Sequence, residues 1–118
     1  MFYQLMVWGK YSGTVQDSLQ YSSAFDHNQK NFTTFDSDND NYEKGNCASH
    51  YKNGWWFDKC FAANLNGKFY HEPYENKMRD GIYWGRWPNK LEGKYMVFTY
   101  IDMKVRPEDF KSAAMKNA

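Results

Sequence analysis

The segment FTTFDSDNDNYEKGNC, residues 32–47, carries the signals that bear most directly on the fold. Its first four residues are β-branched or aromatic, and they predict a short strand that leads into an acidic loop. In that loop Asp36, Asp38 and Asp40 lie two positions apart. Carboxylates this close repel one another, so either their pKa values rise or a cation lies between them. Calcium is the cation that accepts irregular oxygen ligands, and a solvated turn rich in Asp and Asn is the alternative.

The EF-hand, the most familiar calcium loop, is excluded by the spacing. It needs glycine at the sixth loop position and glutamate at the twelfth. Counted from Asp36, those positions hold Asn41 and Cys47, and the register that starts at Asp38 fails as well. Any calcium site in this loop must therefore take backbone carbonyl oxygens to complete its shell.

Composition limits the chain to one small domain with an aromatic core. The chain has 118 residues, of which 20% are aromatic. The formal net charge is +1, and the basic residues are scattered rather than arranged in the stripe that nucleic-acid binding needs. No apolar run approaches the length of a transmembrane helix. We therefore expect no nucleic-acid partner and no membrane insertion.

Cys47 and Cys60 are the only cysteines, with twelve residues between them. That spacing suits one local disulfide, worth about 3 kcal/mol in the loop-entropy model, and two buried free thiols are the alternative. It does not suit zinc, because no second pair of Cys or His ligands accompanies the cysteines. A glycosylation sequon begins at Asn31, which matters only if the chain is secreted.

The remaining patterns predict short strands joined by long loops. Residues 3–9 read as a strand with mixed faces, and GWWF at 54–57 reads as buried core. Residues 36–53 have almost no apolar periodicity and predict a loop. Residues 95–105, YMVFTYIDMKV, look like the best strand in the chain, because apolar residues on both faces are typical of a central, covered strand.

A series of short motifs runs through the chain in order. They are YSGT at 11–14, DSL at 17–19, FTTFDSDND at 32–40, NCA at 46–48, GWWF at 54–57, KC at 59–60, ANLNG at 63–67, GIYW at 81–84 and MKVRP at 103–107. Together they resemble the fibrinogen C-terminal globular domain family, and the resemblance covers the C-terminal half of such a domain. It implies an α+β fold over residues 1–107, with a partial antiparallel sheet and a loop-rich calcium- and ligand-binding subdomain with short helices. Residues 108–118 are expected to be a tail or a short helix.

The resemblance implies a calcium site in the acidic loop. The expected ligands are the side chains of Asp38 and Asp40 and the backbone carbonyls of Tyr42 and Gly45, with the weak affinity of extracellular modules. The segment from Asp40 to Cys47 is one residue longer than in the family's pattern. The extra residue lies within residues 43–45, so the second carbonyl ligand is the part of the site that departs from the family.

The same resemblance implies a disulfide between Cys47 and Cys60 and a cis peptide bond between Lys59 and Cys60. In lectin members such as ficolins and tachylectins, the pocket beside that bond holds the acetyl group of N-acetylated sugars. The corresponding positions here are Tyr51, Lys59, Phe61, Met78 and Arg79. Phe61 has no side-chain hydrogen-bond donor, and Met78 with Arg79 replaces a small apolar wall by a long cation. An apolar slot with a guanidinium at its mouth suits an acidic sugar or a carboxylate-bearing peptide, and a plain surface position for Arg79 is the alternative.

The family resemblance implies a secreted, non-catalytic recognition domain of lectin type, with a glycan ligand as in innate pattern recognition. Alternatives are a protein-interaction or signalling module, as in angiopoietin-like or tenascin-like relatives, or a non-functional fragment. An enzyme is not expected, because the clustered carboxylates are better explained as metal ligands and no nucleophile–base pair is visible. A secretion leader is expected upstream of Met1, and the full-length protein is expected to be oligomeric and extracellular.

Overall fold

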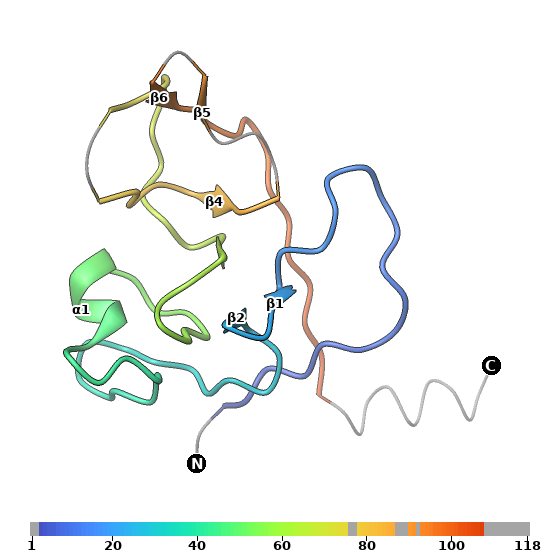
Figure 1. The fold of residues 1–118 in the computed structure, drawn as a ribbon, viewed down its shortest axis with the longest axis vertical. Helices are drawn as coiled ribbons and strands as arrows, with labels where there is room; N and C mark the ends of the chain where they lie inside the picture. Colours follow the sequence, from blue (N-terminus) through green and yellow to red (C-terminus); the bar gives the residue numbers. More distant parts are fainter. Residues whose placement is uncertain (1–2, 76–77, 87–89, 92, 108–118) are drawn as a thin grey trace.

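The computed structural model describes residues 3–75, 78–86, 90–91 and 93–107, and loops make up most of that length (Figure 1). Its regular elements, in chain order, are β1 (Gln20–Ser22), β2 (Phe25–Asp26), α1 (Cys47–Tyr51), β3 (Ala63–Asn64), β4 (Tyr83–Trp84), β5 (Lys90–Leu91) and β6 (Lys94–Tyr95). Within the described ranges the strands form antiparallel pairs, β1 with β2, β3 with β4 and β5 with β6. This confirms the predicted loop-rich α+β class. The expected tail at 108–118 lies outside the described residues.

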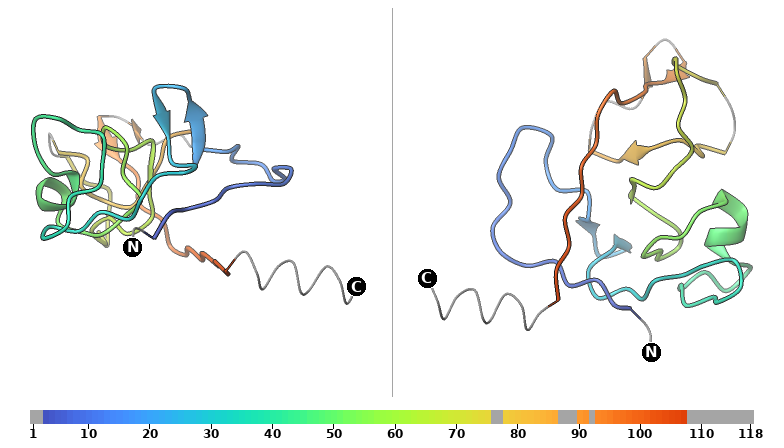
Figure 2. Two further views of the ribbon diagram at one scale, coloured as in Figure 1. Left: turned by 90° about the horizontal axis from the view of Figure 1, so that it is seen from below. Right: turned by 180° about the vertical axis from the view of Figure 1, so that it is seen from behind.

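The β1–β2 hairpin begins where the DSL motif turns the chain. Asp17 Oδ1 accepts hydrogen bonds from the backbone N–H groups of Leu19 and Gln20, at 2.9 and 3.3 Å. Ser18 is fully buried, and its Oγ accepts a hydrogen bond of 2.8 Å from the backbone N–H of Arg86. The motif therefore fastens the hairpin to the segment that follows β4. Figure 2 shows the hairpin projecting from one side of the loops.

The core forms around Trp55 and Phe57, both fully buried. Alternate residues of an extended segment share a face, so the intervening Trp56 points the other way. Its indole Nε1 donates a hydrogen bond of 2.9 Å to the carbonyl of Tyr3. The other members of the core cluster are Cys47, Ala48, Phe61 and Ala63. The prediction that GWWF is core is confirmed, with Trp56 at its edge.

His27 is fully buried and connects several segments of this core, which the sequence patterns did not reveal. Its Nδ1 lies 2.8 Å from the carbonyl oxygen of Trp56. Its Nε2 accepts hydrogen bonds from the backbone N–H groups of Ala62 and Ala63, at 3.0 and 3.1 Å. These partners require a neutral imidazole with the proton on Nδ1. Burial lowers the pKa of His27, which keeps the ring in that neutral form.

The N-terminal segment is paired, but it is not the strand that residues 3–9 predict. The backbone N–H of Leu5 donates to Lys30 O at 2.9 Å, and Leu5 O accepts from Gln29 N at 2.7 Å. Only the pair Gln4 and Asn31 forms a bridge there. Gln29 has φ of 63°, a left-handed conformation that bends its chain and interrupts the ladder.

The prediction of a central strand over residues 95–105 is wrong. Only β6 is regular there, and Tyr95 exchanges backbone hydrogen bonds of 3.0 and 2.6 Å with Tyr74. Residues 96–107 carry no strand and run as an extended chain away from β6 (Figure 1). Tyr100 is 78% exposed and Val105 is 65% exposed. A strand exists only where a neighbour pairs with it, and the residues that the structure describes assign no such neighbour to this segment.

Helix α1 lies inside the region that the sequence predicts to be loop. Asn46 caps its first turn, since its Oδ1 accepts a hydrogen bond of 3.1 Å from the backbone N–H of Ser49. Lys52 ends it with φ of 60° in the left-handed region. In the part of the chain that the structure describes, no helix has the length and apolar character to cross a membrane.

Candidate functional site

The acidic loop between Thr34 and Asn46 is closed on itself by its own carboxylates. Asp40 Oδ1 accepts a hydrogen bond of 2.9 Å from the backbone N–H of Tyr42, and its Oδ2 accepts one of 2.8 Å from that of Cys47. Asp38 Oδ1 accepts a hydrogen bond of 3.3 Å from the backbone N–H of Asp40. Asp38 and Asp40 are therefore neighbours at the centre of the loop.

Asparagine side chains fasten this loop to the core. Asn39 Nδ2 donates to the carbonyl of Phe32 at 2.9 Å, and Asn39 N donates to Thr33 Oγ1 at 2.9 Å. Asn41 Nδ2 donates to Asp58 Oδ1 at 2.8 Å. Asn39 binds the segment that enters the loop, and Asn41 reaches Asp58, well outside it, so two points of the loop are fixed by hydrogen bonds.

Asp40 occupies an environment that is unfavourable for its negative charge. Burial raises the pKa of its carboxyl, and the charge of Asp38 raises that pKa further. The backbone N–H groups of Cys47 and Tyr42 oppose this effect without cancelling it. A cation beside the two carboxylates would relieve the strain between them.

The donor set fits calcium better than a transition metal. The described residues contain no cluster of three or more His, Cys, Asp or Glu side chains, and the neighbouring carboxylates of Asp38 and Asp40 are the predicted charged ligands. Further ligands must be carbonyl oxygens, which calcium accepts readily. Tyr42 O accepts only a long hydrogen bond of 3.5 Å, from Gly45 N, and this contact closes the turn that contains the extra residue. Whether Asp38 and Asp40 hold calcium together with carbonyl oxygens stays a prediction.

The predicted disulfide between Cys47 and Cys60 is confirmed, with Cα atoms 5.6 Å apart. The predicted cis peptide bond between Lys59 and Cys60 is also present. Cys47 begins α1 at the exit of the acidic loop. The disulfide therefore ties that loop to the segment of Lys59 and Phe61.

A cavity of about 520 Å³ lies where these segments meet. Of the residues expected to bind ligand, the structure brings together Tyr51, Lys59, Phe61 and Arg79. Met78 is 37% exposed and does not line the cavity. The rest of the lining is Phe25, Tyr42, Lys44, Gly45, Asn46, Ser49, His50 and Cys60. We call this cavity the recognition pocket.

Arg79 is built into the wall of the recognition pocket rather than lying free on the surface. Its guanidinium carbon lies 5.1 Å from the ring centroid of Phe61 and 5.0 Å from that of Tyr83. Its Nη1 donates a long hydrogen bond of 3.4 Å to Tyr83 Oη. Burial works against the charge, but the phenols of Tyr83 and Tyr51 outweigh it and raise the pKa of Arg79. The wall therefore carries a permanent cation.

Sequence reasoning missed several residues of the pocket. Phe25 reaches it through the β1–β2 hairpin, and Lys44 reaches it from the acidic loop. No motif marks Phe25, since only the folded chain brings it near Phe61. Tyr83 lies within the GIYW motif, but nothing in the sequence shows that its ring supports Arg79.

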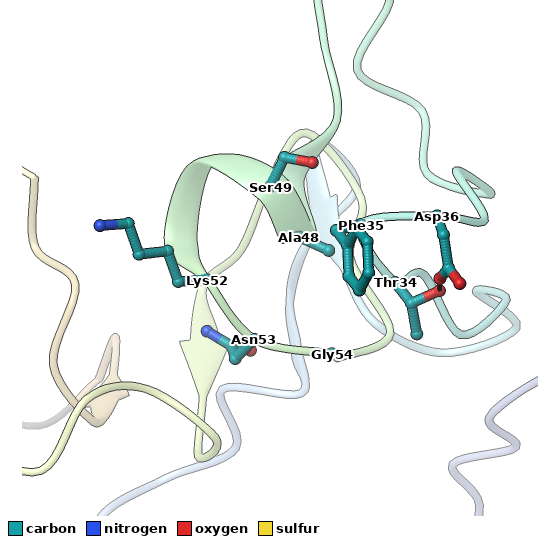
Figure 3. Close-up of a pocket in the computed structure, with 8 residues that line it drawn as sticks. All are labelled: Thr34, Phe35, Asp36, Ala48, Ser49, Lys52, Asn53 and Gly54. Carbon is teal, nitrogen blue, oxygen red and sulfur yellow. Dashed lines mark hydrogen bonds between the residues drawn. The ribbon is translucent and has the colours of Figure 1, made fainter.

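A second cavity, of about 560 Å³, lies on another side of α1 (Figure 3). It is lined by Thr34, Phe35, Asp36, Ala48, Ser49, Lys52, Asn53 and Gly54. The ring of Phe35 faces Ala48 and is 76% exposed. Ser49 lines both cavities, so α1 separates this one from the recognition pocket.

The sequon at Asn31 lies beside the acidic loop. Asn31 is half-buried and bridges to Gln4. Thr33, its third residue, is fully buried and accepts a hydrogen bond from Asn39 N. Glycosylation of Asn31 stays a prediction.

Comparison with known proteins adds an independent line of evidence. A family model described as the C-terminal globular domain of fibrinogen beta and gamma chains matches residues 1–108. Fibroleukin of Bos taurus is 48% identical over 107 residues, which are 87% of this chain and 24% of fibroleukin. Techylectin-5A of Tachypleus tridentatus is 38% identical over 102 residues, which are 86% of this chain and 31% of the techylectin.

A solved structure agrees with these sequence matches. The fibrinogen-like globe domain of human ANGPTL2 has a TM-score of 0.65 and 38% identity, over 81% of this chain and 40% of that one. The chain thus spans less than half of each of these relatives. The order of its motifs, its disulfide and its fold agree with the family match, and the chain belongs to the fibrinogen C-terminal globular domain family.

Proposed function

We propose that this chain carries the ligand-binding part of an extracellular recognition domain, which binds carbohydrate with the support of calcium and catalyses no reaction. The observation that carries the proposal is a shared wall. Tyr42, Lys44, Gly45 and Asn46 belong to the acidic loop and also line the recognition pocket. An ion that stiffens the loop would therefore shape the pocket.

Calcium would be held by the carboxylates of Asp38 and Asp40 and by the carbonyls of Tyr42 and Gly45. When bound, the ion supplies positive charge that offsets the repulsion between the two acids. Only two carboxylates take part, so we expect a dissociation constant on the order of 10⁻⁴ M, as in extracellular modules. The asparagine anchors leave little of the loop to be ordered by binding.

The pocket has the size and surface that a sugar needs. Its volume of about 520 Å³ lies within the usual range for ligand pockets, about 300–1,000 Å³. Half-buried Tyr51 forms an aromatic wall, and its ring is supported by buried Phe61, with 4.7 Å between the ring centroids. Aromatic faces suit the apolar face of a sugar ring. The name of one relative, techylectin-5A, marks it as a lectin, which favours this reading.

An extracellular site of action follows from the same features. The disulfide between Cys47 and Cys60 is of the kind that persists in oxidising compartments. The chain spans 24% of bovine fibroleukin. For any longer protein that contains this chain, secretion, an oligomeric state and an extracellular partner are therefore proposals.

Binding of the oxidised chain to an array of immobilised glycans, in calcium and in EDTA, tests the proposal. We expect binding in calcium that free N-acetylglucosamine or another soluble sugar competes, and that is lost in EDTA. Tyr51→Ala should abolish it, because this removes the aromatic wall of the pocket. Tyr100→Ser, an exposed tyrosine outside the pocket, should leave it unchanged. A folded chain that binds no glycan in calcium would contradict the proposal.

A protein ligand is the second candidate function. The observation that favours it is the exposed apolar segment that contains Tyr100, Ile101, Met103 and Val105. Contiguous exposed apolar patches are typical of surfaces that contact another protein. A cell-surface or plasma protein captured by the chain after enzymatic removal of its glycans would support this second function. If removal of the glycans abolishes capture, the chain binds carbohydrate, which supports the first function.

A further inference from the structure

The recognition pocket is lined by cations on several sides. Lys44 comes from the acidic loop, Lys59 from the segment before the second disulfide cysteine and Arg79 from the segment before β4. Among the lining residues that the structure describes, none is an aspartate or a glutamate. The pocket therefore presents positive charge to whatever enters it.

The carboxylates near the pocket are engaged elsewhere. Both oxygens of Asp40 accept hydrogen bonds from the backbone of its own loop and of Cys47. Buried Asp58 accepts from Asn41 Nδ2 and from Asp26 N, and Asp80 accepts a hydrogen bond of 2.7 Å from Tyr70 Oη. These acids do not line the pocket, and bound calcium would offset the charge of Asp38 and Asp40 as well.

Arg79 is the best placed of the cations. Phe61 and Tyr83 hold its guanidinium over their rings, so the group is partly desolvated and its plane is supported. A planar guanidinium matches the two oxygens of a carboxylate better than an ammonium does. Partial burial strengthens the attraction, because the local dielectric constant is lower than in water.

Aromatic side chains beside these cations set the size and nature of the ligand. Half-buried Tyr51 lines the pocket with an aromatic ring, and a small inorganic anion would leave that ring uncovered. We propose that the recognition pocket selects a saccharide that carries a carboxylate, such as a uronic or nonulosonic acid, with the carboxylate at Arg79 and the ring on the aromatic wall. The inference rests on the proposed function, whose sugar site it makes specific.

Matched sugars that differ only in the acid group test the inference. Calorimetric titration of the oxidised chain in calcium would compare glucuronic acid with glucose, and galacturonic acid with galactose. We expect the acidic member of each pair to bind at least tenfold more tightly. Glucose 6-sulfate is the third arm, because it carries a different oxyanion at the same carbon. Equal binding of glucuronic acid and of the sulfate would show selection for charge alone and would overturn the carboxylate assignment.

Two substitutions assign the preference to the pocket. Arg79→Met keeps an unbranched apolar stem and removes the charge, so the preference for glucuronic acid over glucose should fall to less than threefold. Arg106→Met, an exposed arginine outside the pocket, is the matched control and should leave the preference unchanged. Lys44→Met, at an exposed position, is the variant to use if Arg79→Met does not fold. It should weaken the binding of glucuronic acid but not of glucose.

The outcomes separate this inference from the proposed function. If neutral sugars bind as tightly as their acidic partners, the acid selectivity is wrong while sugar recognition stands. If no sugar binds to the folded chain in calcium, both fail. If the acid preference survives Arg79→Met and Lys44→Met in folded protein, the carboxylate binds elsewhere and the inference is overturned.

Discussion

The carboxylate of Asp40 accepts a hydrogen bond of 2.8 Å from the backbone N–H of Cys47. Cys47 is the first residue of α1 and one end of the disulfide to Cys60. A proposed calcium ligand is thus held by the residue whose disulfide partner, Cys60, lines the recognition pocket. This hydrogen bond and the disulfide connect the acidic loop, the helix and the pocket.

Removal of the disulfide should weaken both stability and calcium binding. In the double variant Cys47→Ser, Cys60→Ser, we expect the free energy of unfolding to fall by about 3 kcal/mol. Because Cys47 N holds Asp40, calcium affinity should fall in the protein that remains folded. Urea denaturation and calcium titration of the variant measure the two effects. Unchanged calcium affinity in folded variant protein would show that the disulfide and the acidic loop are independent.

Loss of the His27 side chain should destabilise the core. His27→Ala leaves the buried N–H groups of Ala62 and Ala63 and the carbonyl of Trp56 without their partner. An unsatisfied buried polar group costs about 1–3 kcal/mol, so we expect a loss of at least about 2 kcal/mol in urea denaturation. His71→Ala, at an exposed position, is the control and should change stability by less than about 0.5 kcal/mol. Equal effects of the two substitutions would refute the role assigned to His27.

Stability should also decrease in mild acid because of His27. Burial lowers the pKa of His27 in the folded protein below its ordinary value of 6.5, so the unfolded chain binds the proton more tightly. The stabilisation by neutral His27 is complete above pH 6.5. It is lost as the pH falls from 6.5 to the pKa of His27 in the folded protein. Each proton taken up on unfolding gives a slope of about 1.4 kcal/mol per pH unit. Denaturation of the chain and of His27→Gln across this range measures it, and identical pH profiles would contradict the assignment.

Gly67 should tolerate no side chain. A Cβ atom there would lie 2.0 Å from the carbonyl oxygen of Gly81, which is backbone and cannot rotate away. We expect Gly67→Ala to lower the free energy of unfolding by more than about 2 kcal/mol. Gly45→Ala is the matched control, because its Cβ would meet only Tyr42, at 3.5 Å. Thermal denaturation compares them, and similar melting temperatures would mean that the approach of residues 67 and 81 is looser than described.

Local chemistry explains which parts of the fold could be predicted from the sequence. GWWF was predicted as core because three bulky aromatic side chains in a row bury too much area to lie in solvent. The disulfide, the cis peptide bond and most pocket residues came from motif resemblance, which carries information about distant contacts that composition lacks. The acidic loop was visible because its charges are adjacent in the sequence.

Features that depend on distant partners were missed. The segment 95–105 has the residues of a strand, but pairing is decided by neighbours, and the sequence of one segment does not reveal them. His27 binds Trp56, Ala62 and Ala63 in the core, and these residues lie 29 to 36 positions further along the chain. Helix α1 is too short for a periodic pattern, although Asn46 is a typical capping residue and is the signal that marks its start.

Calorimetric titration of calcium into the oxidised chain tests the central claim most directly. Asp38→Asn and Asp40→Asn each remove one proposed ligand, whereas Asp36→Asn changes a carboxylate that accepts from Thr34 Oγ1 and is no proposed ligand. We predict saturable binding with a dissociation constant on the order of 10⁻⁴ M in the unaltered chain and in Asp36→Asn, and at least tenfold weaker binding in the other two. No binding by the folded chain, or equal binding by all three variants, would contradict the account.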